Sequence, residues 1–189
     1  RTGRADDTLT ENCRPCPLER RNPGPDRFQE ASPGLIIGRV SGYAQTGPYA
    51  ERAWFSSVGE AMGGLRYING YPGDAPPRAG ISLGDSLAGL FALQGILMAL
   101  YHRDARGGAG QVVDASILES CFALLDNMVP EYGKFGYVRE PNGTRIGYAV
   151  PSNVYRSRDQ RWVVVAAHSD NPWHRLCAAH RRDGLLGDP

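Results

Sequence analysis

Two short apolar segments that lie far apart in the sequence constrain the fold of this chain more than any other feature. The first, LIIGRV, covers residues 35–40, and the second, VVDAS, covers residues 112–116. Continuous apolar runs of this length are typical of strands buried on both faces of a parallel sheet. Because parallel strands are joined by long and usually helical connections, the sequence predicts an α/β fold built from repeating strand–helix units.

Three helices are expected around these strands. The first is expected over residues 51–65, from the helical spacing of four apolar residues: Phe55, Val58, Met62 and Leu65. The second starts near Asp85 and is apolar on nearly every side, which predicts a deeply buried helix. Its longest apolar run, Leu87–Tyr101, is interrupted by Gln94 and is shorter than the ~20 residues that span a bilayer. The third, ILESCFALLDNMV, follows the second strand and is expected to end at Pro130.

The remaining segments predict a change of domain late in the chain. Residues 1–34 are polar and broken by proline. Residues 133–158 have no periodic pattern and are expected to form a linker. After them, WVVVAAH at 162–168 predicts a strand, and a short helix is expected over 173–180. We therefore expect part of a large domain over residues 1–132 and the start of a smaller second domain over 159–189. Because residue 1 is Arg and no apolar leader follows it, we expect an internal piece of a longer protein.

Composition argues against several classes of function. The chain carries 21 Lys and Arg against 20 Asp and Glu, so its balanced charge gives no reason to expect nucleic acid or a membrane as partner. Its four cysteines do not form a disulfide framework, which favours a cytoplasmic location. Cys13 and Cys16 form a single CxxC, and the stripe of His174, Cys177 and His180 lacks a fourth ligand. We therefore expect no metal site.

Asp85 is the strongest candidate for a catalytic side chain. It stands in GISLGDSLAGL, directly after Gly84, at the expected start of the long helix. One interpretation is a helix cap, because Asp is among the best residues at that position. The other is a covalent nucleophile, since a helix N-terminus keeps a carboxylate ionised and Gly84 leaves room for a substrate. Attack on a thioester would then give a mixed anhydride and release a thiolate.

The loop SGYAQTGPY follows the first apolar strand directly and contains Gly42, Tyr43 and Gly47. Loops at the carboxyl ends of parallel strands are where α/β folds bind ligands. A glycine-containing turn that only closes the strand would have the same composition, so the residues alone leave both interpretations open.

Three stretches of the sequence together resemble one known family. They are PGLIIGRVSGYAQTGPYAERAWFSSVGEAMGGL, PPRAGISLGDSLAGLFALQGILMALYHRDARGGAGQVVDASILES and PSNVYRSRDQRWVVVAA. Their joint occurrence and order are similar to the class III CoA-transferases of the CaiB/BaiF type, over roughly Glu11–Cys177. The resemblance implies a Rossmann-like parallel-sheet large domain, here partial, that leads through a linker into a smaller second domain. It also implies a homodimer whose two subunits are interlocked as rings.

The resemblance further implies transfer of CoA between carboxylic acids, with the acyl-CoA thioester as substrate and no separate cofactor. Asp85 occupies the position of the family's catalytic aspartate and would form the mixed anhydride. The residues that would bind CoA or the substrate are Asn12, Arg14, Arg20, Gly42, Tyr43 and Gly84.

The chain also departs from the family pattern. Cys13 replaces the usual aromatic residue, Cys16 a glycine, Ala109 breaks a GRG pattern, and Gln160 stands where the family often has glycine. The first strand–helix unit and most of the second domain are expected to lie outside this chain, so we expect it to be poorly active by itself.

Two alternatives stay open. A 2-methylacyl-CoA racemase of the same superfamily needs a histidine in the region where this chain has Trp54 and Phe55, and no histidine precedes His102. The other alternative is an inactive, truncated remnant that only binds CoA or packs against a partner.

Overall fold

The computed structural model describes residues 7–13 and 24–187. The chain divides into two compact units, one formed by residues 1–67 with 77–139 and the other by residues 68–76 with 140–189. The domain boundaries expected from the sequence stay a prediction.

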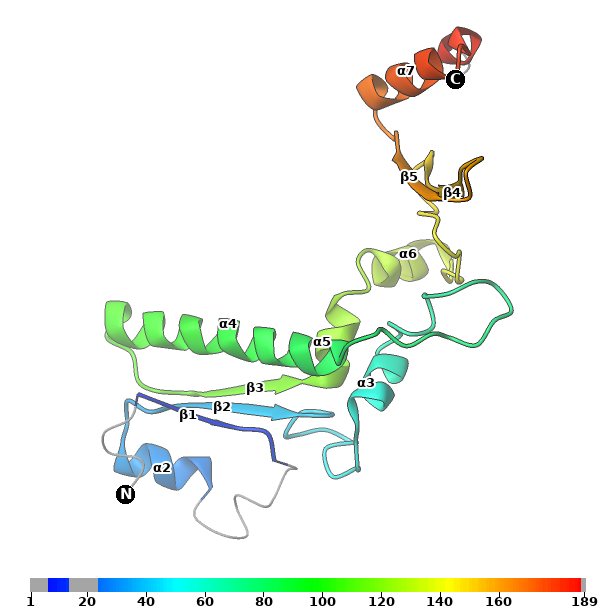
Figure 1. Cartoon of the computed structure of the whole chain (residues 1–189). Coiled ribbons are helices and arrows are strands. Elements are labelled where there is room, and N and C mark those ends of the chain that lie inside the picture. Colours follow the sequence, from blue (N-terminus) through cyan, green and yellow to red (C-terminus); the bar gives the residue numbers. More distant parts are fainter. Residues whose placement is uncertain (1–6, 14–23, 188–189) are drawn as a thin grey trace. The chain divides into compact units, whose positions relative to one another are not determined.

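The first unit is built on a parallel sheet with strand order β1–β2–β3 (Figure 1). Its strands are β1 (Thr8–Glu11), β2 (Ile36–Ser41) and β3 (Val112–Ser116). Thr8 lies opposite Ile36, and Ile37 lies opposite Val112. The structure thus confirms the α/β fold and the presence of both predicted strands. The predicted burial is correct for β2 but wrong for β3, in which Val112 and Asp114 are exposed. Strand β1 was not predicted, because its TLTE segment is polar and only partly buried.

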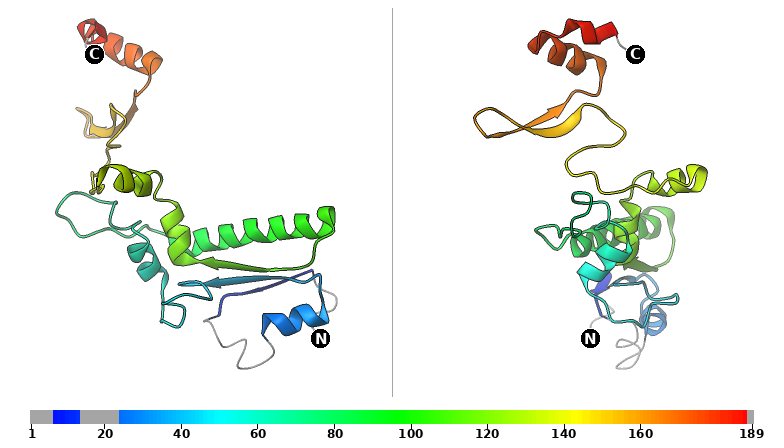
Figure 2. Two further views of the ribbon diagram at one scale, coloured as in Figure 1. Left: turned by 180° about the vertical axis from the view of Figure 1, so that it is seen from behind. Right: turned by 90° about the vertical axis from the view of Figure 1, so that its right-hand side faces the viewer.

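Five helices accompany this sheet in the described part of the unit. They are α2 (Pro25–Ala31), α3 (Ser56–Met62), α4 (Leu83–Arg106), α5 (Ile117–Ala123) and α6 (Met128–Phe135). The long helix α4 covers one face of the sheet, and α2 lies on the other face (Figures 1 and 2). The helix predicted over residues 51–65 is present but shorter.

Helix α4 packs closely on the sheet through small residues. Ala88, Ala92 and Ala99 are buried together with Ile96. A Cβ at Gly38 of β2 would lie 2.7 Å from Ile96 Cδ1, so glycine lets the Ile96 side chain lie directly against the strand. The opposite face of α4 carries large apolar side chains that are exposed in this chain: Leu90, Leu93, Leu97, Met98 and Tyr101.

The prediction that this helix is deeply buried is therefore wrong for its outer face, because an apolar sequence does not show which face of a helix meets a neighbour within the same chain. Leu83–Arg106 is also longer than the predicted apolar run and, by length and composition, could cross a membrane. Core helices of soluble proteins pass the same test, and the alanine face of α4 is packed on the sheet.

The third predicted helix is interrupted. Helix α5 ends at Ala123, Asp126 adopts a left-handed φ of +56°, and α6 begins at Met128. Pro130 lies in the first turn of α6, where a missing N–H breaks no intrahelical hydrogen bond. The expectation that a helix ends at Pro130 is thus wrong: the break precedes the proline.

The second unit contains an antiparallel pair, β4 (Ser152–Arg156) and β5 (Trp162–Ala166), followed by α7 (Asp170–Ala179) and the short 3₁₀ helix η1 (Asp183–Gly187). Strand β5 and helix α7 confirm the predicted elements. Strand β4 falls inside the segment expected to be an aperiodic linker, which is a correction. Gln160 has φ of +66° in the turn between the strands, a conformation that favours glycine.

Candidate active site

Several segments meet the carboxyl edge of the sheet. Asn12 follows β1, the loop that begins at Gly42 follows β2, and Ile117 opens α5 directly after β3. Helix α4 begins at the same edge, beside α3 and α5 (Figure 1). In α/β folds this is the edge where ligands bind.

Asp85 is the third residue of α4 and is exposed. Ser82 occupies the N-cap position, and its side chain makes no capping bond. Within the described residues, the Asp85 carboxylate accepts no hydrogen bond. The helix-cap interpretation of Asp85 is therefore not supported, because the helix begins at Leu83 and the carboxylate satisfies none of its amides.

The start of α4 is held instead by a carboxylate from α3. Glu60 is only 3% exposed, and its Oε1 accepts hydrogen bonds from the backbone N–H of Gly84 at 3.1 Å and from Ser56 Oγ at 3.0 Å. Arg66 Nε donates to Oε2 at 3.1 Å. We call Ser56, Glu60, Arg66 and the Gly84 amide the Glu60 cluster. It satisfies one of the amides that every helix leaves unpaired at its N-terminus.

Glu60 is ionised in this environment. Burial disfavours its charged form, but the hydrogen bonds from Gly84, Ser56 and Arg66, together with the charge of Arg66, outweigh burial and hold the pKa of Glu60 below its ordinary value of 4.5. Arg66 is fixed in turn, because its Nη2 donates to Ser57 Oγ at 3.0 Å.

Sequence reasoning missed Glu60. The predicted apolar stripe of α3 is largely exposed, with Phe55 at 72% and Met62 at 48% exposure, whereas its buried residues are Gly59 and Glu60. A Cβ at Gly59 would lie 2.6 Å from Ile117 Cγ2, so this face packs through glycine. An acidic residue flanked by closely spaced glycines was the signal that could have identified the buried face.

Gly84 is required by this packing. A Cβ there would lie 2.9 Å from both Ile117 Cγ2 and Ser56 Oγ, and 3.1 Å from Glu60 Cγ. On the side where its Cβ would stand, Gly84 thus makes room for protein side chains rather than for a ligand. The backbone before Asp85 therefore lies against α3, through the hydrogen bond from the Gly84 amide to Glu60, and against α5, through Ile117.

The loop after β2 is also tightly packed. A Cβ at Gly42 would lie 2.1 Å from Trp54 Cγ, so Gly42 is needed for the tryptophan to cover the strand end. Tyr43 donates its hydroxyl to Met62 Sδ at 3.3 Å, and its ring lies 5.7 Å from the Tyr49 ring. The structure therefore brings Tyr43 to α3, the helix that also carries Glu60.

Asn12 is exposed and lies just beyond β1. Its neighbour Glu11 pairs with Arg39 of β2 at 2.6 Å, and both side chains are almost completely buried. Glu11 also accepts the N–H of Cys13 at 2.6 Å, which holds the backbone on either side of Asn12. Arg14 and Arg20 lie outside the described residues.

Other chemistry at this edge is limited. Among the described residues, no group of three or more His, Cys, Asp and Glu side chains is arranged to hold a metal ion. The buried thiol of Cys121 lies near the carboxylates, and burial followed by the charges of Glu60 and Asp85 raises its pKa. A protonated thiol is a poor nucleophile, so Cys121 is a weaker candidate than Asp85.

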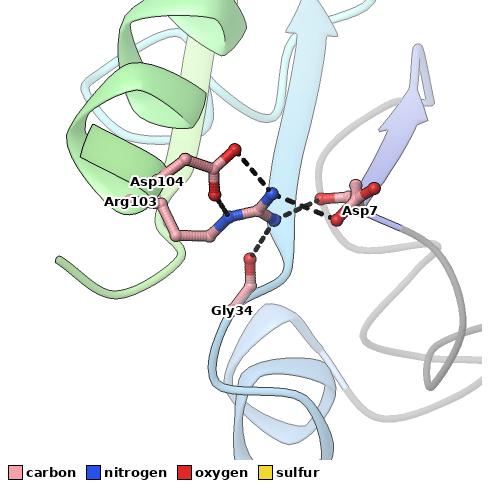
Figure 3. Close-up of polar contacts among 4 residues, drawn as sticks. All are labelled: Asp7, Gly34, Arg103 and Asp104. Carbon is pink, nitrogen blue, oxygen red and sulfur yellow. Dashed lines mark hydrogen bonds and ion pairs between the residues drawn. The ribbon is translucent and has the colours of Figure 1, made fainter. Parts of the chain in front are cut away.

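The other end of α4 carries a second set of charges (Figure 3). Arg103 pairs with Asp104 at 2.6 Å and Asp7 at 3.0 Å, and its Nη1 donates to the carbonyl of Gly34 at 2.9 Å. We call these four residues the Arg103 cluster. It ties the C-terminal end of α4 to the segments that precede β1 and β2.

A three-stranded parallel sheet with helices on both faces defines an α/β protein. The chain belongs to CoA-transferase family III, whose model matches residues 4–189. It is 46% identical to the succinyl-CoA–D-citramalate CoA-transferase of Chloroflexus aurantiacus, over 97% of this chain and 45% of that protein. It is 43% identical to the alpha subunit of a succinyl-CoA–L-malate CoA-transferase of Chloroflexus aurantiacus, over 95% of this chain and 42% of that protein.

Solved structures agree with this assignment. A CaiB/BaiF family protein from Brucella suis superimposes with a TM-score of 0.79 at 26% identity, over 96% of this chain and 48% of that one. The chain thus spans somewhat less than half the length of the relatives it matches.

Proposed function

We propose that the complete protein containing this chain moves CoA from an acyl-CoA to a second carboxylic acid, with Asp85 as the nucleophile. The observation that carries the proposal is the state of the Asp85 carboxylate, which is exposed at the start of α4 and accepts no hydrogen bond within the described residues. A carboxylate bound by several amides would be a weaker nucleophile, because those bonds stabilise its charged ground state.

In the first step an oxygen of Asp85 attacks the thioester carbonyl. A carbon–oxygen bond forms, the carbon–sulfur bond breaks, and CoA leaves as the thiolate, so Asp85 becomes a mixed anhydride. The acceptor carboxylate then displaces the donor acid from the aspartyl carbonyl. Attack of the thiolate on the acceptor carbonyl gives the new thioester and restores the carboxylate of Asp85.

The substrates are inferred from the relatives. Both Chloroflexus aurantiacus proteins are named for succinyl-CoA and for a short hydroxy-dicarboxylic acid. We infer the same classes of donor and acceptor for this protein. Asn12, Arg14 and Arg20 would contact CoA, and Tyr43, with Gly42 and Gly84, would lie near the thioester. We further propose that the complete protein is an interlocked homodimer located in the cytoplasm.

Chemical trapping tests this function. The complete protein is incubated with a panel of acyl-CoAs and hydroxylamine, and the peptide containing Asp85 is analysed by mass spectrometry. A hydroxamate on Asp85 with succinyl-CoA, absent in Asp85→Asn, is the expected result. If CoA binds but no donor gives an adduct, the anhydride route is wrong and the racemase and remnant alternatives gain support.

A further inference from the structure

The Glu60 cluster does more than a helix cap requires. A neutral Ser, Thr or Asn side chain at the N-cap position is enough to satisfy a free amide, and Ser82 stands at that position without using its side chain. The chain instead brings an ionised carboxylate from another helix to the amide of Gly84. A buried ion pair is weak evidence for stability, because removing both charges from water opposes their attraction.

The cluster fixes the residue directly before the proposed nucleophile. Glu60 joins α3 to the first turn of α4, and Ile117 of α5 fills the space beside Gly84. Three helices therefore set the position of the backbone at Asp85, whose own carboxylate makes no hydrogen bond in the described part of the chain. The placement of that carboxylate depends on this backbone anchor.

The cluster also removes a competing donor. The amide of Gly84 is taken by Glu60 at 3.1 Å, so the carboxylate of Asp85 does not need to turn back to satisfy the start of its own helix. Its lone pairs stay available for attack on a carbonyl carbon.

We propose that Glu60 is a positioning residue for Asp85: held by Arg66 and Ser56, it fixes the amide of Gly84 and keeps the Asp85 carboxylate unbonded and directed at the thioester. This inference rests on the proposed function of Asp85. Because a displacement of about 1 Å in a reactive group can lower a rate about 10²-fold, loss of the anchor should mainly affect the rate of anhydride formation.

The test uses three variants of the complete protein: Glu60→Ala, which removes the acceptor; Glu60→Gln, which keeps an acceptor for the Gly84 amide but removes the charge; and Arg103→Gln, which removes an anchor at the other end of the same helix. For each we would measure kcat and KM with succinyl-CoA, the rate of hydroxamate formation at Asp85, and Tm.

Glu60→Ala is expected to lower kcat and the trapping rate about 10²-fold and Glu60→Gln about 10-fold, with KM for succinyl-CoA changed less than about threefold. Arg103→Gln should lower Tm without slowing trapping. If Glu60→Gln has a lower Tm but forms the hydroxamate at the same rate as the unmodified protein, Glu60 is only structural and this inference is overturned. If the unmodified protein itself gives no adduct, the proposed function fails, and this inference fails with it.

Discussion

Both ends of α4 are anchored by charged side chains, but the two clusters differ in burial and in what stands beside them. At the N-terminal end, Glu60 and Arg66 are 3% and 22% exposed. At the C-terminal end, Arg103 is 16% exposed, but its partners Asp104 and Asp7 are 61% and 79% exposed. Asp85 stands next to the first cluster, and no proposed substrate-binding residue belongs to the second.

This difference in burial distinguishes a contact that positions a site from one that only stabilises the fold. Exposed ion pairs cost little to form and contribute little, so the Arg103 cluster fits a purely structural role. Burying the carboxylate of Glu60 carries a desolvation cost, and that cost occurs at the end of α4 that carries the proposed nucleophile.

The largest effect is expected for Asp85→Asn. Removing the proposed nucleophile should lower kcat of the complete protein about 10³-fold or more. Tm should hardly change, because the side chain is exposed and makes no hydrogen bond within the described residues. Steady-state kinetics and thermal unfolding check both parts. Asp104→Asn, on the same helix, is the matched control and should keep its activity; comparable activity in the two variants would remove Asp85 from the mechanism.

Gly84→Ala is expected to have the next largest effect. Its new methyl group would lie closer to Ile117, Ser56 and Glu60 than van der Waals contact allows. Overpacking of this kind typically lowers the free energy of unfolding by about 1–3 kcal/mol. It would also displace the backbone before Asp85 and lower kcat. The control is Gly89→Ala in the same helix, where nothing lies within 4 Å and the change should stabilise by about 0.5–1 kcal/mol.

Urea unfolding and kcat distinguish these two alanine variants. A loss of stability and activity at position 84, with a gain of stability at position 89, would show that close packing at the site is the cause. Equal behaviour of the two variants would contradict the packing described at the start of α4.

A smaller effect is expected at the other end of the helix. Arg103→Gln removes the ion pairs with Asp7 and Asp104 and the hydrogen bond to the Gly34 carbonyl. Tm should fall by a few degrees or less, because two of these partners are largely exposed, while kcat and KM stay unchanged. A fall in kcat that exceeds the loss of folded protein would mean that this end of α4 also positions the site.

The sequence predicted the elements that carry continuous patterns. Strands β2 and β3 and the helix that begins near Asp85 are all present, but only β2 is buried along most of its length, whereas the first three residues of β3 are exposed or partly exposed. A run of apolar residues therefore predicted the element better than its burial. Strands β1 and β4 were missed, since each is short, partly exposed and defined by its neighbour in the sheet rather than by its own residues. The outer face of α4 shows the same limit, since its composition does not reveal what covers it.

The candidate site was predicted only in part, for a similar reason. A motif placed Asp85 at a helix start, but the partner that holds this start comes from α3, 24 residues earlier in the sequence. Glu60 lies opposite the apolar stripe from which the helix was predicted, and the close approach of Gly59 to Ile117 shows that this face is the buried one. Contacts between elements of this kind leave no periodic signal in a single sequence.

The smallest effect should appear in the pH dependence of stability. The pKa of Glu60 is lower in the folded protein than its ordinary value of 4.5, so its ionised form stabilises the fold above that pH, and the contribution is lost as pH falls through the folded pKa. Glu60→Gln cannot titrate there. The difference in unfolding free energy between the two proteins, measured in urea from pH 7 to about pH 3, should therefore be constant near neutrality and shrink in acid. Other carboxylates titrate in both proteins and cancel, so a difference that stays constant down to the lowest pH would mean that Glu60 is not held as a buried anion at the start of α4.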